Sequence, residues 1–337
     1  MKKLKLFYIG IAGIAGLLLI AGCTSKDTSD DAPKRIRLDY GYYSPPSLVL
    51  REFGWLEEEF ENDGIRIEWA LSQGSNKALE FLNSNSVDFG SSAGAAALIS
   101  KANGAPIKNV YIYSKPEWTA LVTGEGSGVR EIADLRGRKV AATLGTDPYI
   151  FLLRALSAEG VPANEVEVVN LQHGDGASSL TTGAVDAWAG LDPHMARLEL
   201  ETGAQLFYRN PDFNTYGFLN VREDFAEKYP EHVKRVIKAY EKARKWSIEN
   251  PEEAAAILAR EARIQEDVAF IQMERNDFSQ AVPGRVQHDA LLEAGRILQA
   301  AGVIRAELDL GQIVESLIEP SFAKDVVVTA AQEAGNG

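Results

Sequence analysis

Through the first two thirds of the chain, short strand-like runs, either apolar or alternating between apolar and polar residues, are each followed by residues with the apolar spacing of a helix. Ile36–Tyr40, Ile65–Trp69 and Val87–Phe89 have the alternation or the apolar character of strands. Apolar residues recur at helical spacing through Leu48–Phe60, after the first run, and through Ser75–Leu82, after the second. This rhythm of strand, loop and helix predicts an α/β chain with a mainly parallel sheet. We expect further strands at Val110–Tyr113, Thr119–Val122, Lys139–Leu144, Val166–Leu171, Val185–Ala189 and Phe218–Val221.

Beyond about Val221 the pattern becomes almost entirely helical. Glu231–Ile248 places most of its apolar residues on one face, and Asn250–Pro251 has the form of another helix start. Gln265–Glu274 and Arg285–Ala301 predict further helices. Because this C-terminal third carries no strand pattern of its own, we expect its helices to pack on the sheet formed by the first strands.

The first 23 residues contain the parts of an export signal. Lys2, Lys3 and Lys5 precede the apolar run Leu6–Ile20, and small residues then lead to Cys23. This ending resembles a lipobox, which implies cleavage after residue 22 and acylation of the cysteine. The alternative is a membrane-spanning helix, because the run is only slightly short of the roughly 20 residues that such a helix needs. The lysines before the run and the cysteine after it favour the export signal.

Polar segments border the part of the chain that is expected to fold. Residues 23–34 lack an apolar face, so we expect a flexible tether there. Residues 331–337 are small and polar, and we expect a frayed tail. About 315 residues remain after residues 1–22 are removed, a length that suits two lobes better than one core.

Composition limits the partners and the chemistry. Loss of the three lysines in residues 1–22 changes the formal charge from −13 to −16. We therefore expect no nucleic acid partner, because phosphate binding needs patches of Lys and Arg. Acylation consumes Cys23, the only cysteine, so neither a disulfide nor a thiolate nucleophile is expected. The histidines are too widely spaced to indicate a metal site, and we expect no metal and no cofactor. They are interpreted as surface or supporting residues: His173, His194, His232 and His288.

One loop has the composition of an anion cradle. Ligands of open α/β sheets bind beyond the C-terminal ends of strands, where helix N-termini present free N–H groups. Phe89–Gly94 follows a predicted strand and precedes an alanine-rich helix. The hydroxyls of Ser91 and Ser92, with the flanking glycines and N–H groups, can hold an anion without a positive charge. A tight turn in which Ser92 caps the helix explains the same residues equally well.

Two Asp-Pro pairs follow later predicted strands. Asp147 precedes a proline at a helix start, so it is interpreted mainly as an N-cap. An anion could bind the N–H groups of Gly145 and Thr146, but the carboxylate would compete for these donors and repel it. Asp192 also precedes a proline, and a role as helix N-cap would explain an aspartate at this position without any ligand.

Aromatic side chains near the predicted loops can form flat walls for a ligand, although packing in the core is their commoner role. Trp188 stands at the end of a predicted strand, where it is either a core residue or such a wall. The other aromatic residues in comparable positions are Tyr42, Tyr43, Trp118, Tyr149 and Tyr216.

Several segments together resemble a known family. They are Ile36–Tyr40, Phe89–Ser92, Ile132–Val140 and Val185–Pro193. They look like the aliphatic-sulfonate and taurine substrate-binding proteins of ABC importers, which belong with the nitrate-type binding proteins in the type 2 periplasmic-binding-protein superfamily. The resemblance covers nearly the whole chain after the tether.

The resemblance implies a two-lobed fold with a ligand cleft. Each lobe would be a mixed, mainly parallel sheet flanked by helices, with the helical C-terminal region packed on lobe one. Lobe one would hold residues 35–121 and 218–330, and lobe two would hold residues 122–217. The anionic head of the ligand would lie between helix N-termini of both lobes. The resemblance and the loop positions together point to these ligand-binding residues: Tyr43, Ser44, Gln73, Gly74, Ser91, Ser92, Trp118, Gly145, Thr146, Asp147, Trp188, Asp192 and Tyr216.

One position departs from the family. Members commonly carry a neutral Gly-Ser/Thr-Ser sequence where this chain has Gly145–Pro148, so a carboxylate, Asp147, replaces a neutral donor. A zwitterion, or a ligand with an amine or several hydroxyls, then fits better than a simple sulfonate. The acid of Asp192 matches a family residue that can meet a ligand amine.

The resemblance implies a monomeric lipoprotein on the outer face of the cell membrane or in the periplasm, which passes a small organic anion to an ABC permease and its ATPase subunits. A binding protein for a thiamin-pyrimidine precursor or another non-sulfonate ligand stays open, as does a sensory lipoprotein without a transporter. An enzyme of the pyrimidine-precursor synthase type is disfavoured, because it depends on a cysteine-rich motif and this chain has Cys23 alone.

Overall fold

The computed structural model describes residues 32–334, with side chains described as far as residue 327. The predicted export signal, Cys23 and the tether up to residue 31 lie outside the described residues, as do residues 335–337. Among the helices that are described, none has both the length and the apolar character needed to cross a membrane.

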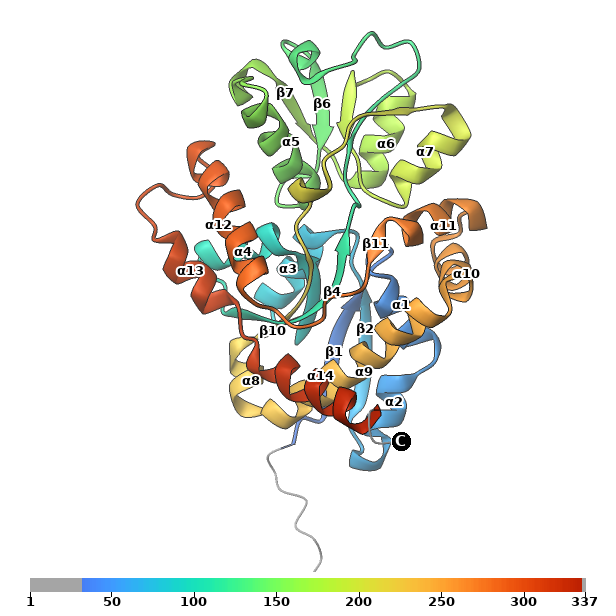
Figure 1. The fold of residues 1–337 in the computed structure, drawn as a ribbon, viewed down its shortest axis with the longest axis vertical. Helices are drawn as coiled ribbons and strands as arrows, with labels where there is room; N and C mark the ends of the chain where they lie inside the picture. Colours follow the sequence, from blue (N-terminus) through green and yellow to red (C-terminus); the bar gives the residue numbers. More distant parts are fainter. Residues whose placement is uncertain (1–31, 335–337) are drawn as a thin grey trace, which may run out of the picture. The chain divides into compact units, whose positions relative to one another are not determined.

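Six strands of the described residues form the first sheet (Figure 1). In spatial order they are β11 (Asn276–Asp277), β4 (Ile107–Pro116), β10 (Gly217–Arg222), β3 (Phe89–Ala93), β1 (Arg35–Tyr40) and β2 (Arg66–Leu71). β1 pairs in parallel with β2 and β3, whereas β10 lies antiparallel between β3 and β4. Strands β1 to β4 therefore share one direction.

Five strands of the described residues form the second sheet. In spatial order they are β7 (Glu167–Asn170), β6 (Lys139–Ala142), β8 (Ala187–Ala189), β5 (Leu121–Thr123) and β9 (Gln205–Tyr208). β6 pairs in parallel with β7 and β8, and β5 lies antiparallel between β8 and β9. Both sheets are thus mixed, as the sequence predicted, and four strands of each run in one direction.

The chain passes between the two sheets twice. Residues 117–120 lead from β4 to β5, and residues 209–216 lead back from β9 to β10. Each crossing delivers the strand that runs against its neighbours, β5 or β10. Leu121, which the predicted lobe boundary places in lobe one, is the first residue of β5.

Helices follow the parallel strands and cover the sheets. They are α1 (Pro45–Glu52), α2 (Trp55–Phe60), α3 (Ser75–Asn83), α4 (Gly94–Ala102), α5 (Asp147–Ala158), α6 (His173–Thr181) and α7 (His194–Thr202). Short 3-10 helices cover Glu61–Asp63, Ile132–Leu135, Ala163–Glu165 and Pro211–Phe213.

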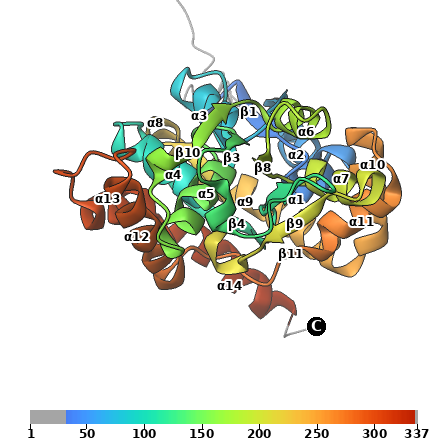
Figure 2. The same cartoon turned by 90° about the horizontal axis from the view of Figure 1, so that it is seen from above.

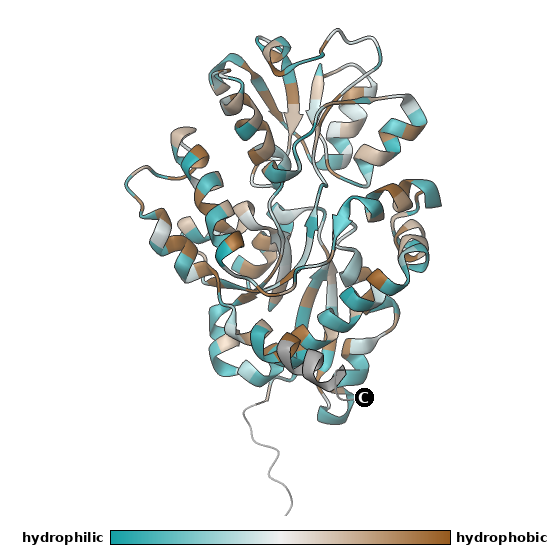
Figure 3. Cartoon of the chain, viewed as in Figure 1, coloured by the Kyte–Doolittle hydropathy of each residue, from teal (hydrophilic) through white to brown (hydrophobic). Residues whose placement is uncertain are grey.

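Strand alternation explains how the second sheet is buried on both faces. Successive side chains of a strand point to opposite faces. In β6, Val140 and Ala142 pack in one hydrophobic cluster with Phe151 of α5, while Ala141 packs in another with Trp188 of β8. Figure 3 shows hydrophobic residues along the strands and a mixture of hydrophobic and hydrophilic residues along the covering helices.

The C-terminal third is helical, as predicted. Its helices are α8 (Glu223–Lys228), α9 (Pro230–Glu249), α10 (Pro251–Ala262), α11 (Glu266–Glu274), α12 (Arg285–Ala300), α13 (Leu310–Leu317) and α14 (Ser321–Ala334). α9 packs on α1 and α2, and α12 and α13 pack on α4. In Figures 1 and 2, α12 and α13 lie on one side of the first sheet, with α10 and α11 on the other. α12 also contacts α5, and α11 contacts α7, so these helices reach the second sheet as well.

Some elements had no sequence prediction. β9, β11 and α13 are short, so their apolar residues repeat too few times at strand or helix spacing to predict an element. α14 continues to Ala334, within the segment 331–337 for which we expected a frayed tail.

Candidate functional site

A cavity of about 360 Å³, here called the central cavity, is lined by loops from both sheets. The loops after β1 and β2 form one wall, and the helix starts after β7 and β8 form the other. All of them leave the C-terminal ends of strands, where ligands of open α/β sheets bind. The lining residues are Tyr42, Tyr43, Leu71, Ser72, Gln73, Gln172, His173, Gly174, Asp175, Leu191, Asp192, Pro193 and His194.

A much smaller cavity of about 10 Å³ adjoins the central cavity. The two share Tyr43, His173 and Leu191 in their walls. The rest of the small cavity is lined by Ser75, Trp118, Thr146, Asp147 and Pro148. The structure therefore brings Tyr43, Gln73, Trp118, Thr146, Asp147 and Asp192, which were predicted from the sequence, to one region between the sheets.

Asp39, near the end of β1, is fully buried and organises the hydroxyl groups beside the central cavity. Its Oδ1 accepts from the N–H of Ser91 at 2.7 Å, and its Oδ2 accepts from the hydroxyls of Ser91 at 2.8 Å and Ser72 at 2.6 Å. The hydroxyl oxygen of Tyr43 lies 2.8 Å from that of Ser72. Burial raises the pKa of Asp39 to about 6, and the bonds from Ser72 and Ser91 oppose this rise. The carboxylate thus engages donors that the sequence had suggested for a ligand.

Ser91 and Ser92, for which the sequence predicted an anion cradle, line neither cavity. Ser91 donates to Asp39, as described above. The hydroxyl of Ser92 donates to the carbonyl of Ala93 at 3.1 Å and accepts from Asn220 Nδ2 at 2.9 Å. Ser92 is not a helix cap either, since α4 begins at Gly94 and Ala93 occupies the N-cap position.

Asp147 ties α5 to both crossing segments instead of capping its helix. Its Oδ2 accepts from Trp118 Nε1 at 2.9 Å and from the N–H of Thr215 at 2.8 Å, and its Oδ1 accepts from the Thr215 hydroxyl at 2.7 Å. Thr146 takes the N-cap position, and its hydroxyl donates to the carbonyl of Thr143 at 2.6 Å. Burial raises the pKa of Asp147, and the bonds from Thr215 and Trp118 oppose this. Gly145 lines neither cavity.

Asp192 precedes Pro193, the N-cap residue of α7, and its carboxylate binds both the first turn of this helix and a cation. Its Oδ1 accepts from the N–H of Ala196 in the first turn of α7 at 2.9 Å. Its Oδ2 lies 3.1 Å from Nη1 of Arg275, whose Nη2 lies 2.5 Å from Glu199. Burial raises the pKa of Asp192 to about 6, and the charge of Arg275 opposes the rise. The carboxylate is therefore already paired within the chain.

Four other predicted residues lie away from the cavities. Trp188 is fully buried in the core of the second sheet, where a Cβ at Gly176 would approach its Nε1 to 2.6 Å. Tyr216 is buried beside α4, and its carbonyl accepts from the N–H of Gly94 at 2.9 Å. Ser44 is also buried and lines neither cavity. Gly74, the fourth, precedes α3 and lies against the ring of His173.

His173 is the main site residue that the sequence analysis missed, because it was interpreted as a surface or supporting residue. It is 2% exposed, begins α6 and lines both cavities. Burial lowers its pKa to about 3, so the ring is neutral. Its position directly after a predicted strand, at the start of a helix, was the available signal.

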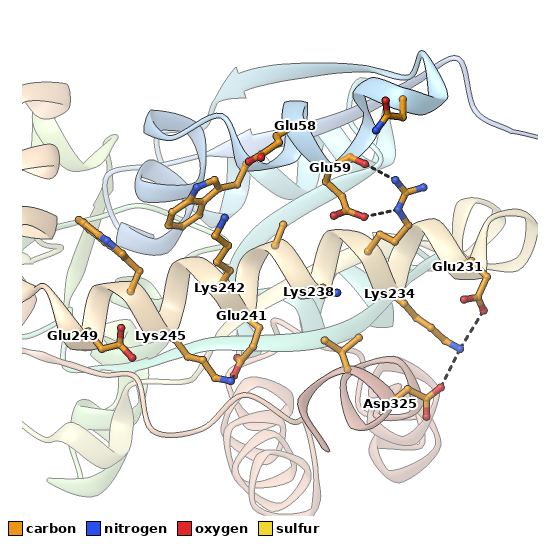
Figure 4. A pocket seen from close by; sticks show the side chains of 16 residues that line it. Glu58, Glu59, Glu231, Lys234, Lys238, Glu241, Lys242, Lys245, Glu249 and Asp325 are labelled. Atoms are coloured by element: carbon orange, nitrogen blue, oxygen red, sulfur yellow. Dashed lines mark hydrogen bonds and ion pairs between the residues drawn. The ribbon is translucent and has the colours of Figure 1, made fainter. Parts of the chain in front are cut away.

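A larger groove, of about 1000 Å³, lies elsewhere, along α9 between α2 and α14 (Figure 4). Several of its charged residues pair with one another. Arg235 Nε lies 2.7 Å from Glu59, and Lys234 lies 3.1 Å from Glu231. Lys242 lies over the ring of Trp55, 4.1 Å from its centroid. Because opposite charges satisfy each other here, the groove is a weaker candidate for a ligand site than the central cavity.

Comparison with known proteins places the chain in a family. Residues 48–254 match the family model described as "NMT1/THI5 like". A protein of Bacillus subtilis (strain 168) named for aliphatic sulfonate binding is 30% identical over 247 residues, which cover 72% of this chain and 74% of that protein.

Solved structures share the fold. The alkanesulfonate-binding protein SsuA from Xanthomonas axonopodis pv. citri bound to MOPS superposes with a TM-score of 0.78 at 21% identity, over 85% of this chain and 99% of that chain. The desulfurization enzyme DSZB superposes with a TM-score of 0.64 at 16% identity, over 88% of this chain and 99% of that chain. The matched family model covers more than half of this sequence, and the chain therefore belongs to the NMT1/THI5-like family.

Proposed function

We propose that this chain is the extracytoplasmic substrate-binding lipoprotein of an ABC importer and captures a small organic anion of the sulfonate or taurine type. The observation that carries the proposal is the central cavity, which is built from the strand-end loops of both sheets. Family membership and the relative named for aliphatic sulfonate binding support it.

Neutral donors would hold the anion. Among the described residues that line the central cavity, none is a lysine or an arginine. The first turn of α6 contributes the N–H groups of His173, Gly174 and Asp175, which have no acceptor within the helix. The side chains of Gln73 and Gln172 add amide donors to the same lining. Such donors gain strength when closure excludes water, yet they hold an anion less tightly than an arginine pair and so permit release.

Capture would proceed by hinge closure of lobe one, residues 35–121 and 218–330, on lobe two, residues 122–217. The crossing segments 117–120 and 209–216 are the hinges in this proposal, because they are the covalent links between the sheets. Asp147 supports the assignment, since it binds Trp118 in one crossing and Thr215 in the other. The closed protein would then deliver its ligand to a permease and its ATPase subunits as a monomer, held to the membrane through lipid on Cys23.

Other functions fit the fold less well or need a different ligand. A thiamin-pyrimidine precursor or another non-sulfonate ligand would use the same cavity, and so would a sensory lipoprotein without a transporter. An enzyme is disfavoured even though DSZB shares the fold. Cys23 is the only cysteine of the sequence, so the cavity has no thiolate nucleophile.

A thermal-shift screen tests the proposal directly. The chain from residue 33 onward would be heated with alkanesulfonates, taurine, nitrate, bicarbonate and pyrimidines. A ligand at 100 times its Kd adds about 2.7 kcal/mol of unfolding free energy, which raises the melting temperature by several degrees. A rise with sulfonates, confirmed by calorimetric titration, would support the proposal. A rise in melting temperature with pyrimidines alone, or no rise with any of these compounds, would contradict it.

A further inference from the structure

We infer that Nε2 of His173 accepts a hydrogen bond from the ligand, and that the ligand is therefore an organic acid that also carries an amine or hydroxyl group. This inference rests on the proposed function and narrows its substrate class. Among sulfonates, it selects aminosulfonates and hydroxysulfonates over unsubstituted alkanesulfonates.

The tautomer of His173 follows from its neighbours. The hydroxyl of Thr143 donates its proton to the carbonyl of Leu171 at 2.6 Å. The same hydroxyl oxygen lies 3.2 Å from Nδ1 of His173. A hydroxyl has one proton, so Thr143 can only accept from the imidazole. Nδ1 therefore carries the hydrogen and Nε2 has a free lone pair.

This lone pair is buried and unpaired. Within the part of the chain that the structure describes, Nε2 of His173 has no hydrogen-bond partner. The residue is 2% exposed, yet it lines both the central and the small cavity. Burial holds the ring neutral by lowering its pKa to about 3, so Nε2 cannot satisfy itself by taking a proton near neutral pH. A buried acceptor without a donor costs free energy, which a ligand N–H or O–H would recover.

The backbone of Gly74 packs against the edge of the His173 ring that carries Nε2. A Cβ at this position would stand 2.7 Å from Nε2 and 3.1 Å from Cδ2 of the ring. Contacts as short as 2.7 Å do not occur between real atoms of this kind, so a larger residue here would displace the imidazole. The glycine thus fixes the position of the imidazole edge that carries Nε2, although Gly74 itself lines neither cavity.

Three of the acids beside the cavities are engaged by other residues of the chain, whereas Asp175, which also lines the central cavity, is exposed at its mouth. Asp39 accepts from Ser91 and Ser72, and Asp147 accepts from Trp118 and Thr215. Asp192, the acid that the family resemblance suggested for a ligand amine, is paired with Arg275. Among the described residues of the cavity wall, the buried acceptors without a partner are Nε2 of His173 and Oε1 of Gln172. Unlike the amide of Gln172, the neutral imidazole cannot turn a donor toward the cavity without changing its tautomer, so it selects a ligand that donates.

Calorimetric titration with matched ligands tests the inference. Taurine and 2-hydroxyethanesulfonate carry a donor where propane-1-sulfonate, of similar length, carries a methyl group. We expect the wild type to bind at least one of the two donor ligands at least about tenfold tighter than propane-1-sulfonate, because a site built around a hydrogen bond rejects the analogue that lacks it. His173→Phe keeps an aromatic ring and removes the acceptor. It should reduce that preference to about threefold or less while retaining propane-1-sulfonate binding.

A matched control is His232→Phe, which replaces a half-buried histidine of α9 that lines neither cavity. It should leave the preference unchanged. A preference that persists in His173→Phe, or a wild type that binds propane-1-sulfonate equally well, would overturn the inference. If none of the three sulfonates binds, the proposed sulfonate function itself fails, which is a distinguishable result.

A spectroscopic measurement on the wild type keeps the test independent of the variant's folding. In protein labelled with ¹⁵N-histidine, His173 should show the Nδ1–H tautomer without ligand. Binding of taurine should shift the Nε2 resonance in the direction of an accepted hydrogen bond. An Nε2–H tautomer, or an unchanged Nε2 resonance in the complex, would refute the inference.

Discussion

Arg275 lies with its Nη1 3.1 Å from Oδ2 of Asp192, and this ion pair joins the C-terminal helices to the loop that leads into α7. The carboxylate of Asp192 is fully buried and the guanidinium is 11% exposed. The carbonyl of Arg275 also accepts from the N–H of Glu117 at 2.7 Å, at the start of the first crossing. One residue of the C-terminal region therefore contacts both the cavity wall and a proposed hinge.

Arg275→Met should destabilise the protein strongly. The variant leaves Asp192 buried without its cation, and breaking a buried pair in this way costs about 3–5 kcal/mol. Urea unfolding followed by fluorescence measures the loss. Arg285→Met is the matched control, because the pair of Arg285 with Asp289 is exposed and contributes at most about 1 kcal/mol. Equal effects of the two variants would contradict this account of Arg275.

Asp147→Asn should weaken the attachment of α5 to both crossing segments. The amide oxygen can still accept from Trp118 Nε1 and from the N–H of Thr215, but without the negative charge, and its NH2 group stands where the Thr215 hydroxyl donates in the wild type, so this hydroxyl would have to rotate. We expect a loss of about 2 kcal/mol in unfolding free energy, the scale of a hydrogen bond to a charged group. Relative to the wild type, amide hydrogen exchange in the variant should accelerate more in residues 209–216 than in β6. Uniform acceleration across the second sheet would argue against a local role.

The sequence predicted the fold well because the signal for it is repeated along the chain. Alternation in β1 and the helical spacing after it both reflect burial on one sheet, and the same rhythm recurs in β6 and α5. Short elements such as β9 and β11 give too few periods to be recognised. The residue ranges predicted for the two lobes came from the resemblance to a family, because no local pattern shows which segments share a lobe.

The site was predicted less completely, because hydrogen-bond partners come from distant segments. Ser91 has the composition of an anion donor, but Asp39, 52 positions away, takes its N–H and its hydroxyl. Asp147 has the form of a helix cap, but Thr215 and Trp118 engage its carboxylate. The bond of Asp192 to the first turn of α7 is local and could be anticipated from the Asp-Pro pair, whereas its pairing with Arg275 could not.

Cys23→Ala should release the protein from membranes. The predicted lipid anchor depends on the thiol of the only cysteine, and the described residues supply no helix that could replace it. Fractionation of cells expressing each form, followed by immunoblotting, measures the distribution. Ser25→Ala, two positions further along, is the matched control and should stay with the membranes. An unchanged distribution of Cys23→Ala would mean that the protein is held in another way.

The buried carboxyl of Asp39 predicts a pH dependence of stability. Its pKa is about 6 in the folded protein, against an ordinary value of 3.8, because burial disfavours the charged form. A group whose pKa is raised by folding stabilises the native state at low pH, and this contribution is lost as the pH rises through the folded pKa. Between about pH 4 and pH 7.5 the wild type should lose about 2 kcal/mol relative to Asp39→Asn, which cannot ionise.

Urea titrations of both forms at several pH values measure this difference, and the comparison with the variant cancels the titration of the other carboxylates. The variant can keep part of the network, because the hydroxyls of Ser72 and Ser91 can rotate to accept from the amide. The two stability curves should therefore converge or cross as the pH rises. Curves that run parallel from pH 4 to pH 7.5 would mean that the three donors of Ser91 and Ser72 fully compensate the burial of the charge, and that Asp39 ionises in the folded protein near its ordinary pKa.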